Sequence, residues 1–371
     1  RAGDCAGCHT ARGGASYAGS RAIETPFGTV VASNLTPDSQ TGLGRWSADD
    51  FWRALHDGRS RDGRLLVPAF PYPNYTLVSR DDADALYAWL RSLPAVEQPN
   101  RPHALRFPYG TQAALAAWRL LYFAPQRFVP DPARPAEWNR GAYLVQGLGH
   151  CSACHASRNA LGATAGPLDL GGGLIPVQNW YAPSLAAPHE AGVQQRDAAQ
   201  VVQLLKSGIA GGASMAGPMA EVVAGSTQHL ADADLRAIAA YLRALPVEPP
   251  PPQAPPPRAD PRVIDHGATV YDRHCAQCHG EHGEGVGAYP PLAGNRAARL
   301  DTPANLVNAV LQGGFAPATA GNPRPFGMPP FAPLLADDDI AAVLSFIRAS
   351  WGNRAAPVTP YDVQRFRARG P

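Results

Sequence analysis

The chain has 371 residues and a mass of 39.1 kDa, which is more than one hydrophobic core usually organises, so two or three domains are expected. Charged residues make up only 17% and the formal net charge is +2, so nucleic acid is not expected as a partner. The sequence contains no apolar run as long as a membrane-spanning helix. The chain is therefore expected to be soluble or at most peripherally attached to a membrane.

Proline and glycine are abundant, with 39 and 37 residues, which favours short helices joined by long loops. All six cysteines fall into three copies of the pattern Cys-x-x-Cys-His. These copies begin the repeats in chain order, as Cys5-Ala-Gly-Cys8-His9, Cys151-Ser-Ala-Cys154-His155 and Cys275-Ala-Gln-Cys278-His279.

This pattern is the attachment signature of c-type haem. Its two thiols add to the haem vinyl groups, and the adjacent histidine binds the iron from the same helical turn. The sequence therefore predicts three covalently bound haems, with His9, His155 and His279 as iron ligands. Because such attachment takes place outside the cytoplasm, we expect the mature chain in the bacterial periplasm, with its export signal removed.

Three other chemistries fit the pattern less well. A thioredoxin-like Cys-x-x-Cys lies in a strand-helix unit, whereas glycine-rich loops surround these pairs. A zinc site needs two further ligands nearby, and no second Cys-x-x-Cys or His-x-x-x-His accompanies any copy. Disulfide scaffolds use varied spacings and have no invariant following histidine.

The same order of features follows each attachment motif, which indicates an internal repeat. A loop leads to a helix ending in Leu-x-x-Gly, and a proline-rich loop then leads to a closing amphipathic helix. Ser79 is the expected start of the first closing helix. The Leu-x-x-Gly marks are residues 55–58, 205–208 and 311–314, and the closing helices carry Leu86, Leu90 and Leu93; Leu235, Ile238, Leu242 and Leu245; and Ile340, Val343, Leu344 and Ile347.

The repeats divide the chain into domains at residues 1–98, 135–246 and 262–371. The proline-rich segment 247–261 is expected to be an extended linker. Segment 99–134 joins the first two domains and is rich in apolar residues, which we expect to be buried between those domains; the alternative is a surface patch for a partner. These residues are Trp118, Leu120, Leu121, Tyr122, Phe123 and Phe128.

The starts of the repeats differ. Helix-like segments precede the second and third motifs, EWNRGAYLVQGLGH and RVIDHGATVYDRH, but only four residues precede Cys5. We therefore expect that residues belonging before the first motif are missing from this sequence.

Methionine thioethers are the common sixth ligands of haem iron in electron carriers. The chain has three methionines. Met328 in FGMPPF and Met219 in GPMAEV stand in matching proline-flanked loops, and both are predicted to bind iron. Met215 is the rival to Met219, and its other interpretation is a core side chain.

The first repeat has no methionine, and Phe70 stands at the expected position. His56 occupies a position that is Lys206 and Gln312 in the other repeats, so we expect it to face water rather than iron. His103, in the junction, is the remaining candidate from this part of the chain. The first haem is therefore five-coordinate, bound by His103, or bound by an unexpected group.

The chain resembles the three-haem cytochrome c subunits of bacterial membrane-bound dehydrogenases. The resemblance covers nearly the whole sequence and is carried by SNLTPD (33–38), FPYPNY (70–75), ALYAWLRSLP (85–94), WNRGAYLVQGLGHCSACH (138–155), GPMAEVV (217–223) and SFIRASWGN (345–353). It implies an all-α fold of three consecutive class I cytochrome c-like domains. In this family a methionine is common where Phe70 stands.

The resemblance also implies partners and a route for electrons. A catalytic dehydrogenase subunit of flavin, quinoprotein or molybdenum type would supply electrons, and ubiquinone or a downstream cytochrome or oxidase would accept them. The chain would work in the periplasm at the outer face of the inner membrane. Phe70 in place of methionine is more similar to the variants that accompany molybdenum hydroxylases.

No nucleotide-binding or zinc-protease motif occurs in the sequence: GxGxxG, GxxxxGK[ST] and HExxH are all missing. The predicted function is therefore electron transfer as a subunit, with no catalytic residues of its own. Two alternatives stay open, a haem enzyme that binds a small ligand at the first haem and a free-standing periplasmic electron shuttle.

Overall fold

The structure is a computed structural model that describes residues 1–249 and 256–368. It comprises two compact units. The first is formed by Arg1–Leu170 and His229–Tyr241, and the second by Gly171–Gln228 and Leu242–Pro371. The second sequence repeat thus contributes to both units. The division into three cytochrome-like domains stays a prediction.

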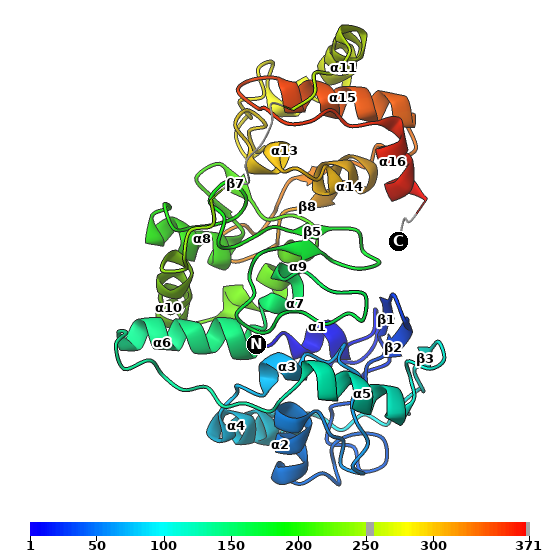
Figure 1. Cartoon of the computed structure of the whole chain (residues 1–371), viewed down its shortest axis with the longest axis vertical. Helices are drawn as coiled ribbons and strands as arrows, with labels where there is room; N and C mark the ends of the chain where they lie inside the picture. The colour runs from blue at the N-terminus through cyan, green and yellow to red at the C-terminus, as the bar shows by residue number, and fades with distance from the viewer. Residues whose placement is uncertain (250–255, 369–371) are drawn as a thin grey trace. The chain divides into compact units, whose positions relative to one another are not determined.

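The first unit consists of short helices with one small sheet (Figure 1). Strands β1, β2 and β3 form an antiparallel sheet in that order. The elements are α1 (Cys5–His9), β1 (Ala22–Thr25), β2 (Gly28–Val31), α2 (Ala48–Asp57), α3 (Tyr72–Tyr75), α4 (Arg80–Arg91), β3 (Ala104–Leu105), α5 (Gln112–Tyr122), α6 (Ala136–Tyr143), the π-helix η1 (Leu144–Leu148), α7 (Ser152–His155) and most of α10 (Asp232–Arg243).

The second unit combines helices with two-residue hairpins that pair as β4–β5, β6–β7 and β8–β9. Its elements are β4 (Gly173–Leu174), β5 (Tyr181–Ala182), α8 (Ala198–Ser207), β6 (Ile209–Ala210), β7 (Ala213–Ser214), α9 (Pro218–Gly225), the 3₁₀-helix η2 (Thr227–His229), which ends in the first unit, α11 (Pro261–His274), α12 (Ala276–His279), α13 (Arg296–Arg299), α14 (Ala304–Gln312), β8 (Gly314–Phe315), β9 (Gly327–Met328), α15 (Asp337–Ala349) and α16 (Pro360–Arg367).

The predominantly helical fold agrees with the expected fold class, but the small sheets were not expected. Strands of two to four residues are too short to show a periodic pattern in the sequence. They form where long loops fold back on themselves, and one of them carries Met328.

The three closing helices form as α4, α10 and α15, but α4 and α10 end at Arg91 and Arg243, two residues before the predicted Leu93 and Leu245. The Ser79 hydroxyl caps α4 by accepting a hydrogen bond from the Asp82 amide at 3.2 Å. Their apolar faces lie in the cores: Leu90, Leu235, Ile238, Leu242, Ile340, Val343, Leu344 and Ile347 are all buried.

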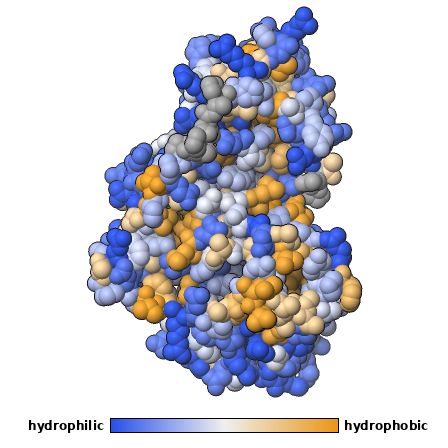
Figure 2. Space-filling view, viewed as in Figure 1, coloured by the Kyte–Doolittle hydropathy of each residue, from blue (hydrophilic) through white to orange (hydrophobic). Residues whose placement is uncertain are grey.

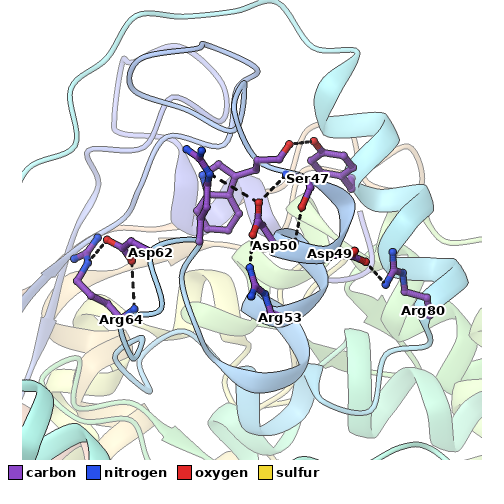
Figure 3. Close-up of polar contacts among 10 residues, drawn as sticks. Ser47, Asp49, Asp50, Arg53, Asp62, Arg64 and Arg80 are labelled. Carbon is purple, nitrogen blue, oxygen red and sulfur yellow. Dashed lines mark hydrogen bonds and ion pairs between the residues drawn. The ribbon is translucent and has the colours of Figure 1, made fainter.

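Helix α2 shows how the sequence sets a helix start. The Ser47 hydroxyl accepts a hydrogen bond from the Asp50 amide at 3.1 Å, and the Asp50 carboxylate accepts one from the Ser47 amide at 2.9 Å (Figure 3). This capping box satisfies two amides that lack partners within the helix. Asp49 forms an ion pair with Arg80 at 2.7 Å, which connects the start of α2 with α4.

The Leu-x-x-Gly marks also end helices. Gly58 and Gly208 are the C-caps of α2 and α8, with φ of 59° and 80°. Glycine adopts such left-handed angles without steric cost. In the third repeat the C-cap is Gly313 instead, one residue before the predicted Gly314.

Two pairs of helices cross at glycines. A Cβ atom at Gly141 of α6 would lie 1.9 Å from the Ala237 carbonyl oxygen of α10, and one at Gly267 of α11 would lie 2.2 Å from that of Ala342 in α15. Both glycines come from the helix-like segments that precede the second and third motifs. Their missing side chains allow the helix backbones to touch.

The expected burial of the junction 99–134 is wrong in part. Trp118, Phe123 and Phe128 are half-buried, but Leu120 and Leu121 are 87% and 66% exposed. Figure 2 shows hydrophobic residues gathered where Figure 1 places α5. Helix α5 buries Leu115 on one face and leaves Leu120, Leu121 and Tyr122 exposed.

The predicted linker lies partly outside the described residues, which omit 250–255. After it, α11 starts at Pro261, and the Asp260 side chain caps the helix by accepting from the Arg262 amide at 2.8 Å. Among the described residues, none of the helices is long and apolar enough to cross a membrane.

Candidate functional site

The first attachment motif forms α1, which places Cys5, Cys8 and His9 on little more than one helical turn. The Nδ1 atom of His9 lies 2.7 Å from the Ser33 carbonyl oxygen. Because a carbonyl only accepts, Nδ1 donates the proton, and Nε2 of the neutral ring keeps its lone pair for a metal. Burial lowers the pKa of His9, which favours this neutral form.

The third motif repeats this arrangement in the second unit. Cys275 precedes α12, which carries Cys278 and ends at His279. The Nδ1 atom of His279 lies 2.9 Å from the Pro290 carbonyl oxygen, so Nδ1 again donates and Nε2 is left with its lone pair. A backbone acceptor at this place fixes both the tautomer and the ring orientation of a ligand histidine.

Met328 lies in the second unit, which also contains the third motif. It belongs to β9, where it pairs with Gly314 of β8. Cys275 and Met328 are both partly buried against the same hydrophobic core, which is formed mainly by α11, α14 and α15. A Cβ atom at Gly313 would lie 2.3 Å from the Met328 carbonyl oxygen, so a glycine at this position allows the hairpin to close.

The second motif follows the π-helix η1. The Cys151 amide donates to the Val145 carbonyl at 3.1 Å, and α7 carries Cys154 and His155. Short π-helices are rare and are often found at functional sites. Here η1 precedes the attachment turn directly.

The two methionines predicted for the second motif lie in the second unit. Met219 is in the first turn of α9, after Pro218 at N1. A Cβ atom at Gly217 would lie 2.8 Å from the Trp180 ring, so the tryptophan packs directly on this loop. Met215 precedes α9, and its amide donates to the Gly208 carbonyl at 2.8 Å. Since His155 belongs to the first unit, its pairing with Met219 stays a prediction.

All six cysteines carry free thiols. Burial raises the pKa of Cys151 to about 12 and that of Cys275 to about 11, so both are protonated at neutral pH. Paired thiols on one turn, next to a histidine whose Nδ1 is bound to a carbonyl, are the groups that a covalently attached haem needs. The described residues therefore fit this cofactor, and they argue against a disulfide scaffold.

Phe70 occupies a place in the first unit like that of Met328 in the second. Cys5 and Phe70 both pack, partly buried, against one hydrophobic core that includes Tyr75. The Phe70 and Tyr75 rings lie 5.3 Å apart. A phenyl ring has no lone pair for iron, so the side chain at this place supplies packing only.

His103 lies beside the small sheet of the first unit. Its Nδ1 atom accepts a hydrogen bond from the Val31 amide at 3.1 Å. In the neutral ring the proton is therefore on Nε2, which leaves that atom without a lone pair. Burial and the charge of Arg64 lower the pKa of His103. This tautomer does not favour His103 as a ligand of the first haem.

The expectation that His56 faces water is wrong. Its side chain is only 13% exposed, its ring stacks on Trp52 at 4.6 Å, and its Nδ1 atom donates to the Thr76 carbonyl at 2.9 Å. A position that is polar in all three repeats can still be largely shielded from water when the side chain finds a carbonyl partner and a ring to stack on.

Sequence reasoning missed three contributors to the sites. Ser33 and Pro290 act through their backbone carbonyls, for which residue type gives no signal. Asn74 donates to the Gln146 carbonyl and the Ser152 hydroxyl, both at 2.8 Å. Asn74 lies in the FPYPNY segment, but its partners are more than seventy residues away and no local pattern identifies them.

Comparison with known proteins adds two findings. The family model described as Cytochrome c matches residues 139–246 and 264–351, in the second and third repeats. Similarity to individual proteins extends over the whole chain. It is 39% identical over 390 residues to "Alcohol dehydrogenase (quinone), cytochrome c subunit" of Gluconacetobacter polyoxogenes, an alignment that covers 100% of this chain and 83% of that protein.

Two further relatives are named as subunits of other dehydrogenases. The "Gluconate 2-dehydrogenase cytochrome c subunit" of Pantoea cypripedii is 37% identical over 388 residues, covering 99% of this chain and 87% of that protein. The "Fructose dehydrogenase cytochrome subunit" of Gluconobacter japonicus is 33% identical over 399 residues, covering 100% of this chain and 81% of that protein.

Proposed function

The chain belongs to the family of cytochrome c subunits of dehydrogenases, and from this premise we propose that it takes electrons from a catalytic dehydrogenase subunit and passes them through three covalently bound haems. The observation that carries this proposal is the repeated attachment turn. In the first and third motifs it joins two free thiols to a histidine whose Nδ1 is bound to a carbonyl oxygen.

Three kinds of residue hold the haems: cysteines, histidines and methionines. The cysteine pairs of the three motifs form the thioether bonds, and His9, His155 and His279 bind iron from one side. Met219 and Met328 bind from the other side at the second and third sites. The haems supply one-electron chemistry, and the chain positions them and sets their potentials through the ligands, burial and hydrogen bonds.

Electrons leave to ubiquinone or to a downstream cytochrome or oxidase, and the chain works in the periplasm at the outer face of the inner membrane. Two considerations support this part of the proposal. Haem attachment through thioethers takes place outside the cytoplasm, and the name of the alcohol dehydrogenase relative includes a quinone. The donor is a dehydrogenase of flavin, quinoprotein or molybdenum type.

Two measurements test the proposal. Intact mass should exceed the polypeptide mass by three haems, and fewer would contradict the three-site assignment. The native protein should also co-purify with a larger dehydrogenase subunit, whose substrate should reduce the haems in an absorption spectrum. Haems that stay oxidised in the purified complex with substrate would contradict the electron-transfer role.

Phe70 favours a second candidate function at the first site, the binding of a small ligand to an open iron position. Cyanide or peroxide would then shift the absorption spectrum, and the oxidised protein would show a high-spin ferric band. A spectrum unchanged by both ligands would remove this candidate and leave electron transfer alone.

A further inference from the structure

The short helix α3 of the first repeat contacts the surroundings of two attachment motifs. Its residue Tyr75 donates a hydrogen bond from its hydroxyl to the Gly3 carbonyl at 3.2 Å, two residues before Cys5. Its neighbour Asn74 donates to the Ser152 hydroxyl at 2.8 Å, and Ser152 stands between Cys151 and Cys154. Consecutive residues of one helix therefore contact two attachment turns.

The contact of Asn74 is buried and uses both N–H groups of its side-chain amide. Asn74 is 6% exposed and Ser152 is 1% exposed. The side-chain nitrogen also donates to the Gln146 carbonyl at 2.8 Å, so both of its N–H groups have partners. Loss of one partner from a hydrogen bond shielded from water is costly in free energy, because the other polar group stays buried and unsatisfied.

Other contacts hold the two turns against each other. The Nε2 atom of His150, directly before Cys151, lies 3.2 Å from the same Gly3 carbonyl oxygen that Tyr75 contacts. Leu148 packs against the hydrophobic core that also contacts Cys5.

We propose that α3 clamps the first and second attachment turns together, so that their haems form an electrostatically coupled pair in which Asn74 is the positioning residue. This inference rests on the proposed function, because it requires haems at both motifs. Charges held close together in a protein interior interact more strongly than charges in water. Coupled centres then change state in two steps that belong to the pair rather than to either centre.

The test uses the full protein in three forms: the wild type, Asn74→Ala and a matched control, Gln112→Ala. Gln112 also has an amide side chain that joins distant segments of the first unit, since it accepts from the Leu65 amide at 2.7 Å and donates to the Leu65 carbonyl at 3.2 Å. Leu65 belongs to neither attachment turn and is not a partner of a ligand histidine.

The readout is a redox titration followed by absorption and by electron paramagnetic resonance. Asn74→Ala should shift the potentials of the first two haems and reduce the interaction between them, while Gln112→Ala should leave both unchanged. The third haem is identified as the one that responds to replacement of Met328, and it serves as the internal reference. Intact mass establishes that all three haems are present.

Asn74→Ala with three haems and an unchanged titration would overturn the inference, as would an equal shift in Gln112→Ala. If Asn74→Ala does not fold, Ser152→Ala removes one partner of the clamp and must show the same direction of change. A wild-type mass without covalent haem would instead overturn the proposed function, so the two failures are distinguishable.

Discussion

The first and third attachment sites share the attachment turn, its histidine and the carbonyl that binds the histidine, which together we call the frame. They differ at one chemically decisive position. In both, a histidine donates its Nδ1 proton to a backbone carbonyl, that of Ser33 or of Pro290. In both, the first cysteine packs against a hydrophobic core, but that core also contacts Phe70 at the first site and Met328 at the third.

This difference shows that the same frame forms with either a phenylalanine or a methionine at the position proposed for the sixth ligand. Phenylalanine and methionine both fill a half-buried apolar place, and only methionine offers a sulfur lone pair to iron. The fold can thus keep the attachment turn and the histidine while the chemistry of the opposite face changes. Substitutions at and around the two sites can separate these contributions.

The largest effect is expected when the attachment cysteines are removed. Cys5→Ala with Cys8→Ala should lose one haem, and Cys275→Ala with Cys278→Ala should lose another, because each pair forms both thioether bonds of its site. Intact mass measures the loss. A first-site double variant that keeps three haems would show that the two frames are not equivalent.

Exchanging the side chains at the sixth position should exchange the behaviour of the sites. Met328→Phe should abolish one share of the methionine-to-iron absorption band and lower the third potential by a substantial part of the roughly 0.8 V that axial ligands span. Phe70→Met should add a share of that band.

Met215→Leu is the control for this exchange, because Met219 is the predicted ligand of the second site. It should leave the band and all three potentials unchanged. A band that survives in Met328→Phe, or one that disappears in Met215→Leu, would refute the methionine assignments.

The frame of the third site should depend on the crossing of α11 and α15. Gly267→Ala would place a carbon 2.2 Å from the Ala342 carbonyl oxygen, and overpacking of this kind costs about 1–3 kcal/mol. Thermal unfolding measures the loss. Gly147→Ala is the control, since its nearest neighbour would lie at 3.7 Å, and equal destabilisation by both would contradict the role of the crossing.

The smallest effect concerns the helix starts. Hydrogen bonds from the Ser47 amide and hydroxyl, with a contribution from Arg53, lower the pKa of Asp50. The ionised carboxylate therefore stabilises the fold above its unfolded pKa, and this stabilisation is lost as pH falls through the lowered folded pKa. Asp50→Asn should cost about 1 kcal/mol at neutral pH and little in acid.

Denaturant unfolding at both pH values measures this difference. The corresponding helix of the third repeat, α14, has Pro303 as its N-cap and no side-chain cap hydrogen bond. The stability cost of a substitution at its start should therefore not depend on pH. A cost of Asp50→Asn that is equal in acid and at neutral pH would show that the carboxylate charge does not stabilise α2.

Local patterns were sufficient to predict the attachment turns and the closing helices. The Cys-x-x-Cys-His spacing matches one helical turn, and the apolar periodicity of α15 matches its buried face. Long-range partners could not be predicted in this way. Residue type does not identify the Ser33 carbonyl as the partner of His9, and no spacing connects Asn74 with Ser152.

Exposure was also difficult to predict. The apolar run around Leu120 and Leu121 indicated burial, but periodicity alone does not tell which face of a helix finds a partner. His56 shows the reverse error, because stacking and one hydrogen bond are enough to bury an imidazole at a position that is otherwise polar.

Electron paramagnetic resonance of the oxidised protein tests most directly whether the first and third sites share a frame but differ in their sixth ligand. The account predicts two low-spin signals typical of histidine and methionine ligation, from the second and third haems, and a distinct third signal from the haem beside Phe70. Three alike low-spin signals of the histidine and methionine type would contradict it.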